Sequence, residues 1–245
     1  MSSGLFNSSP LHISKVDSFE ISIENWFDIV GLKKEYWTFI GSIGKKEFSG
    51  DVDIAILQSS PDGDLEDWKD TFEQLGLKYR IFKGFNQISF GYPFEGQMVQ
   101  VDLMLTTDLE WSKFIYYSPN LSTLESKYGG IYRKNLLVSL IKVESFKKSV
   151  GGYERYILTN DQGMFFVRKI VDATGKETVI EKTHFSRSIP EILECLHLEP
   201  PCLTFEQIYN QILDRPKFKE IMEEFEKSCL NSKIEIPKYE EQNYA

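Results

Sequence analysis

The sequence predicts an α/β fold: a mixed, twisted sheet flanked by helices, followed by a C-terminal region of helices and a hairpin. Three observations predict this class. Short β-branched and aromatic runs alternate with amphipathic helical patterns in the first half of the chain. Several of these runs alternate apolar and polar residues with the period of a strand. Residues 153–182 contain strand-like segments separated by turn residues, between helical segments.

In the first half, apolar residues at Ile23, Phe27 and Val30 predict an amphipathic helix that ends near Gly31. Residues 36–40 then predict a strand that ends at the Gly41-Ser42 turn. The remaining predicted elements are a strand at 52–57, a turn at 59–64, a helix at 65–76, one or two strands at 78–93 with a break near Gly84, and a strand at 98–106.

In the second half, the patterns predict helices at 109–119 and 133–148, paired strands at 153–182, and helices at 188–198 and 204–230. We interpret residues 1–125 as a catalytic core and residues 126–245 as a substrate-binding region. We expect the boundary between the two regions to lie somewhere between residues 110 and 150. No Pro/Gly-rich linker marks it.

Composition excludes some classes of protein. Hydrophobic residues make up 41% of the 245 residues and charged residues 27%, which is typical of a chain with a packed core. No apolar run is long enough to predict a membrane span, and the N-terminus lacks the pattern of a secretory signal. Three cysteines indicate free thiols in a reducing compartment, so we expect a cytoplasmic protein.

Charge is unevenly distributed along the chain. The net charge is −9, which argues against a generic nucleic-acid coat. Residues 51–75 hold eight acidic residues and one basic residue, whereas residues 127–187 hold twelve basic and six acidic ones. An enzyme that holds metal ions and grips a polyanion would have this distribution. Ordinary surface variation explains it equally well.

Acidic side chains interrupt two of the predicted strands. Asp51 and Asp53 lie on the face of residues 52–57 that is opposite the apolar face, about 7 Å apart by strand rise. Asp102 lies in the middle of the strand at 98–106, again opposite an apolar face. If the two strands are neighbours, three carboxylates converge, and Mg²⁺ or Mn²⁺ is the cation that such oxygens prefer.

The turn before these strands could hold phosphate. Gly41 allows the backbone to approach a ligand closely, and Ser42 adds a hydroxyl group. Lys45 and Lys46 add positive charge, and Ser49 could support the loop or a carboxylate, although a plain turn residue is an equal alternative. These residues would hold a nucleoside triphosphate between the turn and two metal ions.

The order of these elements resembles the DNA polymerase β-like nucleotidyltransferase superfamily. The matching segments are "FIGS", "DVDI" and "VQVDLML", within roughly residues 20–110, and the spacer between Ser42 and Asp51 is eight residues. The resemblance implies that Asp51, Asp53 and Asp102 bind the metals and that Gly41 and Ser42 hold the triphosphate. The alternative is structural: Asp51 caps a loop, while Asp53 and Asp102 pair with Lys45, Lys46 or Arg80. An inactive member is a third possibility.

Other chemistry-bearing residues leave alternatives open. Tyr116, Tyr117 and Lys113 could meet a base or a phosphate, or pack between the two regions. The segment with Lys127, Tyr128, Arg133 and Lys134 could grip a substrate or be a solvated helix start. Arg80 and Lys83 are better interpreted as surface charge. Cys195, His197 and Cys202 lack a fourth zinc ligand, which favours burial over a metal site.

The reaction implied by the resemblance is transfer of a nucleotidyl group from a nucleoside triphosphate to an acceptor hydroxyl, with release of pyrophosphate. The basic segment favours an RNA or tRNA 3′ end as the acceptor. A protein or small-molecule hydroxyl is the alternative, and a non-catalytic nucleotide-binding or antitoxin-like module is another. The sequence identifies no protein partner.

Overall fold

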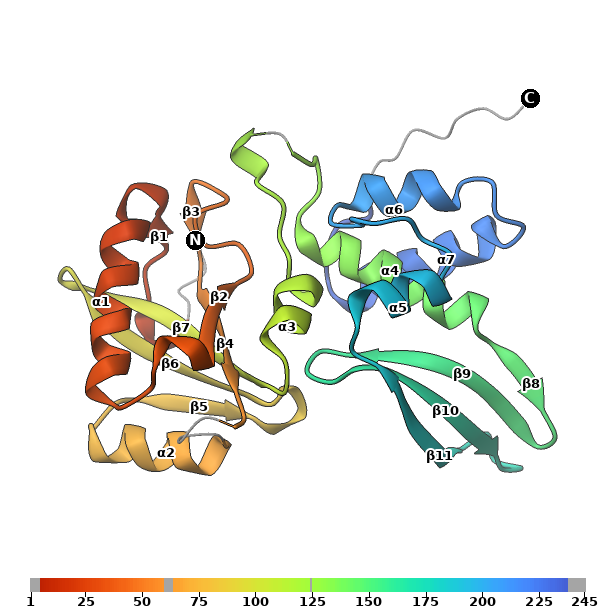
Figure 1. The fold of residues 1–245 in the computed structure, drawn as a ribbon, viewed down its shortest axis with the longest axis horizontal. Helices are drawn as coiled ribbons and strands as arrows, with labels where there is room; N and C mark the ends of the chain where they lie inside the picture. The colour runs from red at the N-terminus through yellow and green to blue at the C-terminus, as the bar shows by residue number, and fades with distance from the viewer. Residues whose placement is uncertain (1–4, 60–63, 124, 238–245) are drawn as a thin grey trace.

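The computed structural model describes residues 5–59, 64–123 and 125–237, which confirm an α/β protein with mixed and antiparallel sheets (Figure 1). The helices are α1 Val16–Ile29, α2 Leu65–Gln74, α3 Leu109–Ile115, α4 Gly130–Glu144, α5 Ile189–Cys195, α6 Phe205–Ile212 and α7 Phe218–Asn231. The strands are β1 Leu11–His12, β2 Trp37–Ile40, β3 Phe48–Ser49, β4 Val52–Leu57, β5 Tyr79–Phe82, β6 Gln87–Phe94, β7 Gln97–Thr106, β8 Lys147–Ser149, β9 Gly152–Thr159, β10 Gly163–Val171 and β11 Glu177–Ser186.

A five-stranded mixed sheet, in the order β2-β4-β7-β6-β5, organises residues 5–106, which we call the N-terminal unit. Strands β4 and β7 are parallel, and the other neighbouring pairs are antiparallel. The apolar face carries Val52, Ile54 and Ile56, whose side chains are fully buried. They pack in one cluster with buried residues of α1 and α2. The alternation that predicted these strands therefore sets which face is covered by helices and leaves the polar face on the other side.

The C-terminal unit, residues 108–237, combines helices α3 to α7 with a four-stranded antiparallel sheet in the order β11-β10-β9-β8. Trp111 and Phe114 of α3 pack in a second buried cluster with residues of α4 to α7. The two clusters divide between Leu105 and Trp111. Figure 1 shows the two units side by side, with α3 and the start of α4 between them.

Two sequence expectations need comment. The helical stretch expected at 204–230 consists of two helices, α6 and α7, because Pro216 disfavours helical geometry at the residue before it. The turn expected at 59–64 lies largely outside the described residues. Helix α2 begins directly after it, where the Asp64 side chain accepts hydrogen bonds from the amides of Glu66 and Asp67 as an N-cap.

Candidate active site

Two of the three predicted carboxylates lie side by side on the polar face of the sheet. Asp53 of β4 and Asp102 of β7 are directly paired residues in the parallel register, and Ile40 of β2 pairs with Asp53 on its other side. Asp51 lies in the bend that precedes β4. Asp102 is only 6% exposed, whereas Asp51 and Asp53 are half-buried.

These carboxylates are crowded and poorly compensated. Burial raises the pKa of Asp53 well above its usual range, and the charges of Asp51 and Asp102 raise it further, against weaker opposing effects of Lys46 and Lys134. Burial also raises the pKa of Asp102, although hydrogen bonds from its neighbours oppose this. One of these bonds joins Gln100 Nε2 to Asp102 Oδ1 at 3.1 Å. The site would therefore be stabilised by additional positive charge.

The structural alternative required the aspartates to pair with lysine or arginine. In the part of the chain that the structure describes, no ion pair involves Asp51, Asp53 or Asp102. Arg80 is exposed, and Lys83 lies 3.6 Å from Glu66 at the surface. The carboxylates are thus not neutralised in the way that this alternative expected.

The Gly41-Ser42 turn lies directly against Asp53. Gly41 has φ +71°, and a Cβ at this position would overlap Asp53 Oδ2 and lie 3.1 Å from Asp53 Cγ. Only glycine combines this backbone conformation with so close an approach. The Ser42 carbonyl accepts hydrogen bonds from the Lys45 amide at 3.1 Å and from Ser49 Oγ at 3.3 Å. Ser49, which is 2% exposed, therefore supports the loop from inside.

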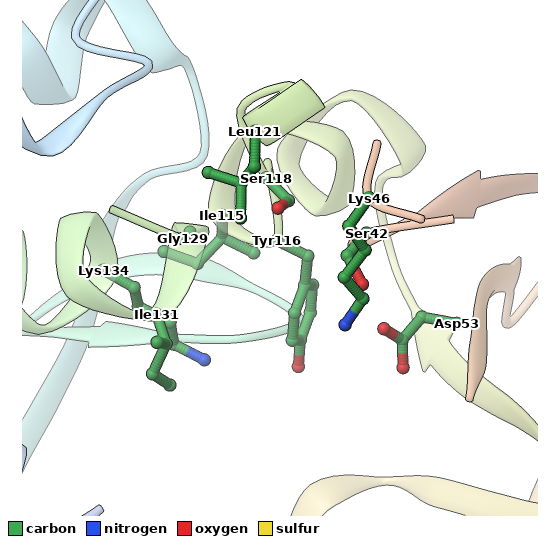
Figure 2. A pocket seen from close by; sticks show the side chains of 12 residues that line it. Ser42, Lys46, Asp53, Ile115, Tyr116, Ser118, Leu121, Gly129, Ile131 and Lys134 are labelled. Atoms are coloured by element: carbon green, nitrogen blue, oxygen red, sulfur yellow. The ribbon is translucent and has the colours of Figure 1, made fainter. Parts of the chain in front are cut away.

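Lys45 and Lys46 take different positions. Lys46 lines the cavity described below, and its side chain extends toward Asp53 (Figure 2). The ammonium of Lys45 lies 4.6 Å from the centre of the Tyr117 ring instead. Burial lowers the pKa of Lys45, and the nearby charge of Glu125 opposes this shift. Of the two predicted lysines, only Lys46 faces the candidate site.

A cavity of about 340 Å³ opens between the two units beside these residues (Figure 2). Its N-terminal wall is formed by Gly41, Ser42, Lys46 and Asp53. Its C-terminal wall is formed by Ile115, Tyr116, Ser118, Leu121, Gly129, Gly130, Ile131 and Lys134. Asp51, Asp102, Lys45 and Ser49 are not among the lining residues. The cavity thus joins a polar, charged wall to a largely apolar one.

The sequence left the C-terminal wall largely undetermined. Tyr116 and Lys134 are possible substrate contacts by their residue types, and both line the cavity. Ile115, Ser118 and Leu121 carried no signal, because apolar and small residues in this pattern occur in any packed segment. Lys113 pairs with Glu110 at the surface, and Tyr117 donates a hydrogen bond to Glu125 at 2.6 Å.

The two cysteines for which the sequence favours burial over a zinc site lie in the C-terminal unit. Cys202 is buried, and its thiol donates to the Glu199 carbonyl at 3.0 Å. Cys195 is half-buried, and burial raises its pKa. Both cysteines therefore pack in the core of the C-terminal unit, away from the carboxylates.

The carboxylates fit a hard divalent cation by their chemistry. Carboxylate oxygens are the ligands that Mg²⁺ and Mn²⁺ prefer, and a cation would offset the burial and the acidic neighbours that raise the pKa of Asp53. The side chains are not gathered into a ready ligand set: within residues 5–59, 64–123 and 125–237, no three His, Cys, Asp or Glu side chains form a group that could hold a metal ion.

Comparisons with protein-family models and with curated proteins gave no match to this chain. None of the helices in the described part of the chain is both long and apolar enough to cross a membrane.

Proposed function

We propose that this protein is a metal-dependent nucleotidyltransferase with a fold of the DNA polymerase β-like type. It transfers a nucleoside monophosphate from a nucleoside triphosphate to an acceptor hydroxyl. The observation that carries the proposal is the pairing of Asp53 with Asp102 on parallel neighbouring strands, directly against the Gly41-Ser42 turn. The charge of Asp51 acts on both carboxylates, which supports its place in the same group.

In this proposal Asp51, Asp53 and Asp102 hold Mg²⁺ or Mn²⁺. When bound, the metal neutralises phosphate charge and favours the deprotonated acceptor oxygen. The bond from that oxygen to the α-phosphorus forms, the bond between the α-phosphorus and the bridging oxygen breaks, and pyrophosphate leaves. Asp102 would assist by accepting the hydroxyl proton, while charge stabilisation by the metal would supply the larger part of the catalysis.

The phosphates would be held by the turn. The Ser42 hydroxyl and the Lys46 ammonium both reach the cavity beside Asp53. Ser49 holds the Ser42 carbonyl from inside, which keeps the turn in place. The apolar part of the opposite wall, including Ile115 and Leu121, would exclude water from the base and ribose.

The acceptor class is the second part of the proposal. The basic segment supports an RNA 3′ end, as expected from the sequence. A small-molecule or protein hydroxyl gains support from ion pairs that neutralise part of that segment, between Lys142 and Glu224, Arg168 and Glu154, and Lys169 and Glu177. A silent nucleotide-binding module would bind nucleotide without release of pyrophosphate.

The test is incubation with each labelled nucleoside triphosphate, Mg²⁺ or Mn²⁺, and separate fractions of cellular RNA, protein and small molecules. We expect one fraction to become labelled with the wild-type protein and with Asp70→Asn, a surface control on α2. Asp53→Asn should reduce the transfer at least a hundredfold. Transfer by Asp53→Asn at the wild-type rate would exclude the proposed reaction.

A further inference from the structure

The start of α4 and the Gly41 turn both contact the segment formed by residues 117–118. Gly41 forms an isolated parallel bridge with Tyr117. On the other side of the same segment, a Cβ at Gly130 would overlap the Tyr117 carbonyl oxygen and lie 3.1 Å from Ser118 Cα. The absence of a side chain at Gly130 thus allows the helix start to pack closely against residues 117–118, the segment with which Gly41 also forms its bridge. The first turn of α4 is thereby fixed at the cavity.

Two adjacent basic residues of α4 have different environments. Arg133 is fully buried, and its guanidinium donates hydrogen bonds to the Phe114 carbonyl and to the Cys202 carbonyl, the latter at 3.1 Å. This residue ties α4 to its neighbours in the C-terminal core. Lys134 lines the cavity instead, and its ammonium lies 4.7 Å from the centre of the Tyr116 ring. The arginine has a structural role that the lysine does not share.

Lys134 is not held in an ion pair within the described part of the chain. Among residues 5–59, 64–123 and 125–237, neither Lys134 nor Lys46 forms an ion pair. Burial and the charge of Arg133 lower the pKa of Lys134, Asp53 across the cavity opposes them, and the net pKa is about 8. Keeping a partly desolvated ammonium without an ion pair costs free energy, which the Tyr116 ring offsets only in part and a bound anion would offset further.

Figure 2 shows Lys134 and Lys46 entering the cavity from opposite walls, with Tyr116 between them. The proposed donor carries several negative charges on a flexible phosphate chain, and lysine binds phosphate as a point charge. A polyphosphate bound by Ser42 and Lys46 at one wall could also contact the ammonium of Lys134 at the opposite wall.

We propose that Lys134 binds the phosphates of the donor from the C-terminal unit, so that the donor bridges the two units. The identity of the anion as a donor triphosphate rests on the proposed function. Lys134 is then a substrate-binding residue that the resemblance to a family does not supply.

The experiment is calorimetric titration of the full chain with inorganic tripolyphosphate in the presence of Mg²⁺. The variants are Lys134→Gln and Lys134→Met, and the matched control is Lys142→Gln, which changes a lysine of the same helix that is paired with Glu224 outside the cavity. Both Lys134 variants should fold, because they remove a desolvated charge without a partner. Thermal melting verifies this.

We expect the two Lys134 variants to bind tripolyphosphate at least tenfold more weakly than the wild type and Lys142→Gln to bind within twofold of it. Equal binding by the Lys134 variants, equal loss in Lys142→Gln, or no binding by the wild type would each overturn the inference. Lys134-dependent binding without any nucleotide transfer would instead count against the proposed reaction alone. If Lys134→Gln binds tripolyphosphate as tightly as the wild type and still transfers the nucleotide, the phosphate-binding role of Lys134 is wrong and the proposed reaction stands.

Discussion

Asp53 combines a half-buried carboxylate with two acidic neighbours. Its pKa is raised by burial and then by Asp51 and Asp102, so the ionised form is unfavourable in the folded protein without a cation. A carboxylate in these surroundings lowers the stability of the folded protein unless a cation binds to it, and such destabilising groups are common at functional sites. The residue that matters most for the proposed function should therefore also be a source of instability.

The first prediction concerns stability. Because the folded protein holds the Asp53 proton more tightly than the unfolded chain does, stability falls as pH rises from the ordinary pKa of aspartate through the raised pKa. Asp53→Asn removes this loss. We expect its melting temperature to exceed that of the wild type at about pH 7.5, by about 2–4 °C for each kcal/mol recovered.

The pH dependence provides the control for this prediction. The difference between Asp53→Asn and the wild type should shrink toward zero at about pH 4.5, where the wild-type carboxyl is increasingly protonated. Mg²⁺ should raise the melting temperature of the wild type and not that of the variant. A variant that is less stable than the wild type at every pH would contradict the account of Asp53.

A second prediction separates two effects of a side chain at a positive φ. Gly41→Ala would strain the backbone and also push into the Asp53 carboxylate. Gly44, in the same loop, has φ +69°, but its added Cβ would meet only Val16 Cγ1, at an ordinary 3.6 Å. We expect Gly44→Ala to lose about 1 kcal/mol of stability through backbone strain and Gly41→Ala to lose more, because its Cβ also overlaps Asp53. Only Gly41→Ala should reduce nucleotide transfer, at least tenfold; an equal reduction in Gly44→Ala would indicate a general effect of loop strain.

At the scale of elements, the strands were the most predictable part of the fold. Residues 52–57 and 98–106 alternate apolar and polar side chains so regularly that strands β4 and β7 follow directly. Their pairing did not follow, because alternation specifies a face and not a neighbour. Only the folded sheet makes Asp53 and Asp102 direct neighbours.

The helix starts illustrate the same limit. The Asp64 cap of α2 follows from a local side-chain preference and is visible in the sequence. The start of α4 has no side-chain cap, and its position depends on the close approach of Gly130 to Tyr117. Since this contact joins separate segments, the local pattern that made Lys134 a candidate for binding a substrate could not decide between that role and a solvated helix start, nor separate it from the buried Arg133.

A third prediction tests whether α2 serves stability alone. Asp64→Ala removes the cap of a helix whose Trp68 and Phe72 are buried in the N-terminal core, away from the cavity-lining residues. We expect a loss of about 1 kcal/mol in unfolding free energy, measured by urea denaturation, with unchanged nucleotide transfer. Asp70→Ala on the same helix removes an equal charge without a cap and should leave stability nearly unchanged. A loss of transfer in Asp64→Ala at temperatures where it is folded would show that α2 influences the site.

At the scale of the whole molecule, two buried clusters pack on either side of the cavity. The N-terminal unit supplies Asp53 and the Gly41-Ser42 turn to the cavity, and the C-terminal unit supplies Tyr116, Lys134 and an apolar wall. The sequence indicated the N-terminal half of the site because its residues follow one another in a characteristic order within about 60 positions, from Gly41 to Asp102. The second half depends on how α3 and α4 dock, which is a property of the assembled molecule.

The most direct measurement of the central claim is the fate of the phosphates of a nucleoside triphosphate labelled separately at the α- and the γ-position. With wild-type protein, Mg²⁺ and the responsive acceptor fraction, the α-label should move to the acceptor and the γ-label should appear in pyrophosphate. Asp53→Asn and Asp102→Asn should each abolish both events, while Asp70→Asn should preserve them. Release of the γ-label as inorganic phosphate, or α-label transfer by either carboxylate variant at the wild-type rate, would contradict the claim that these two aspartates form the catalytic site.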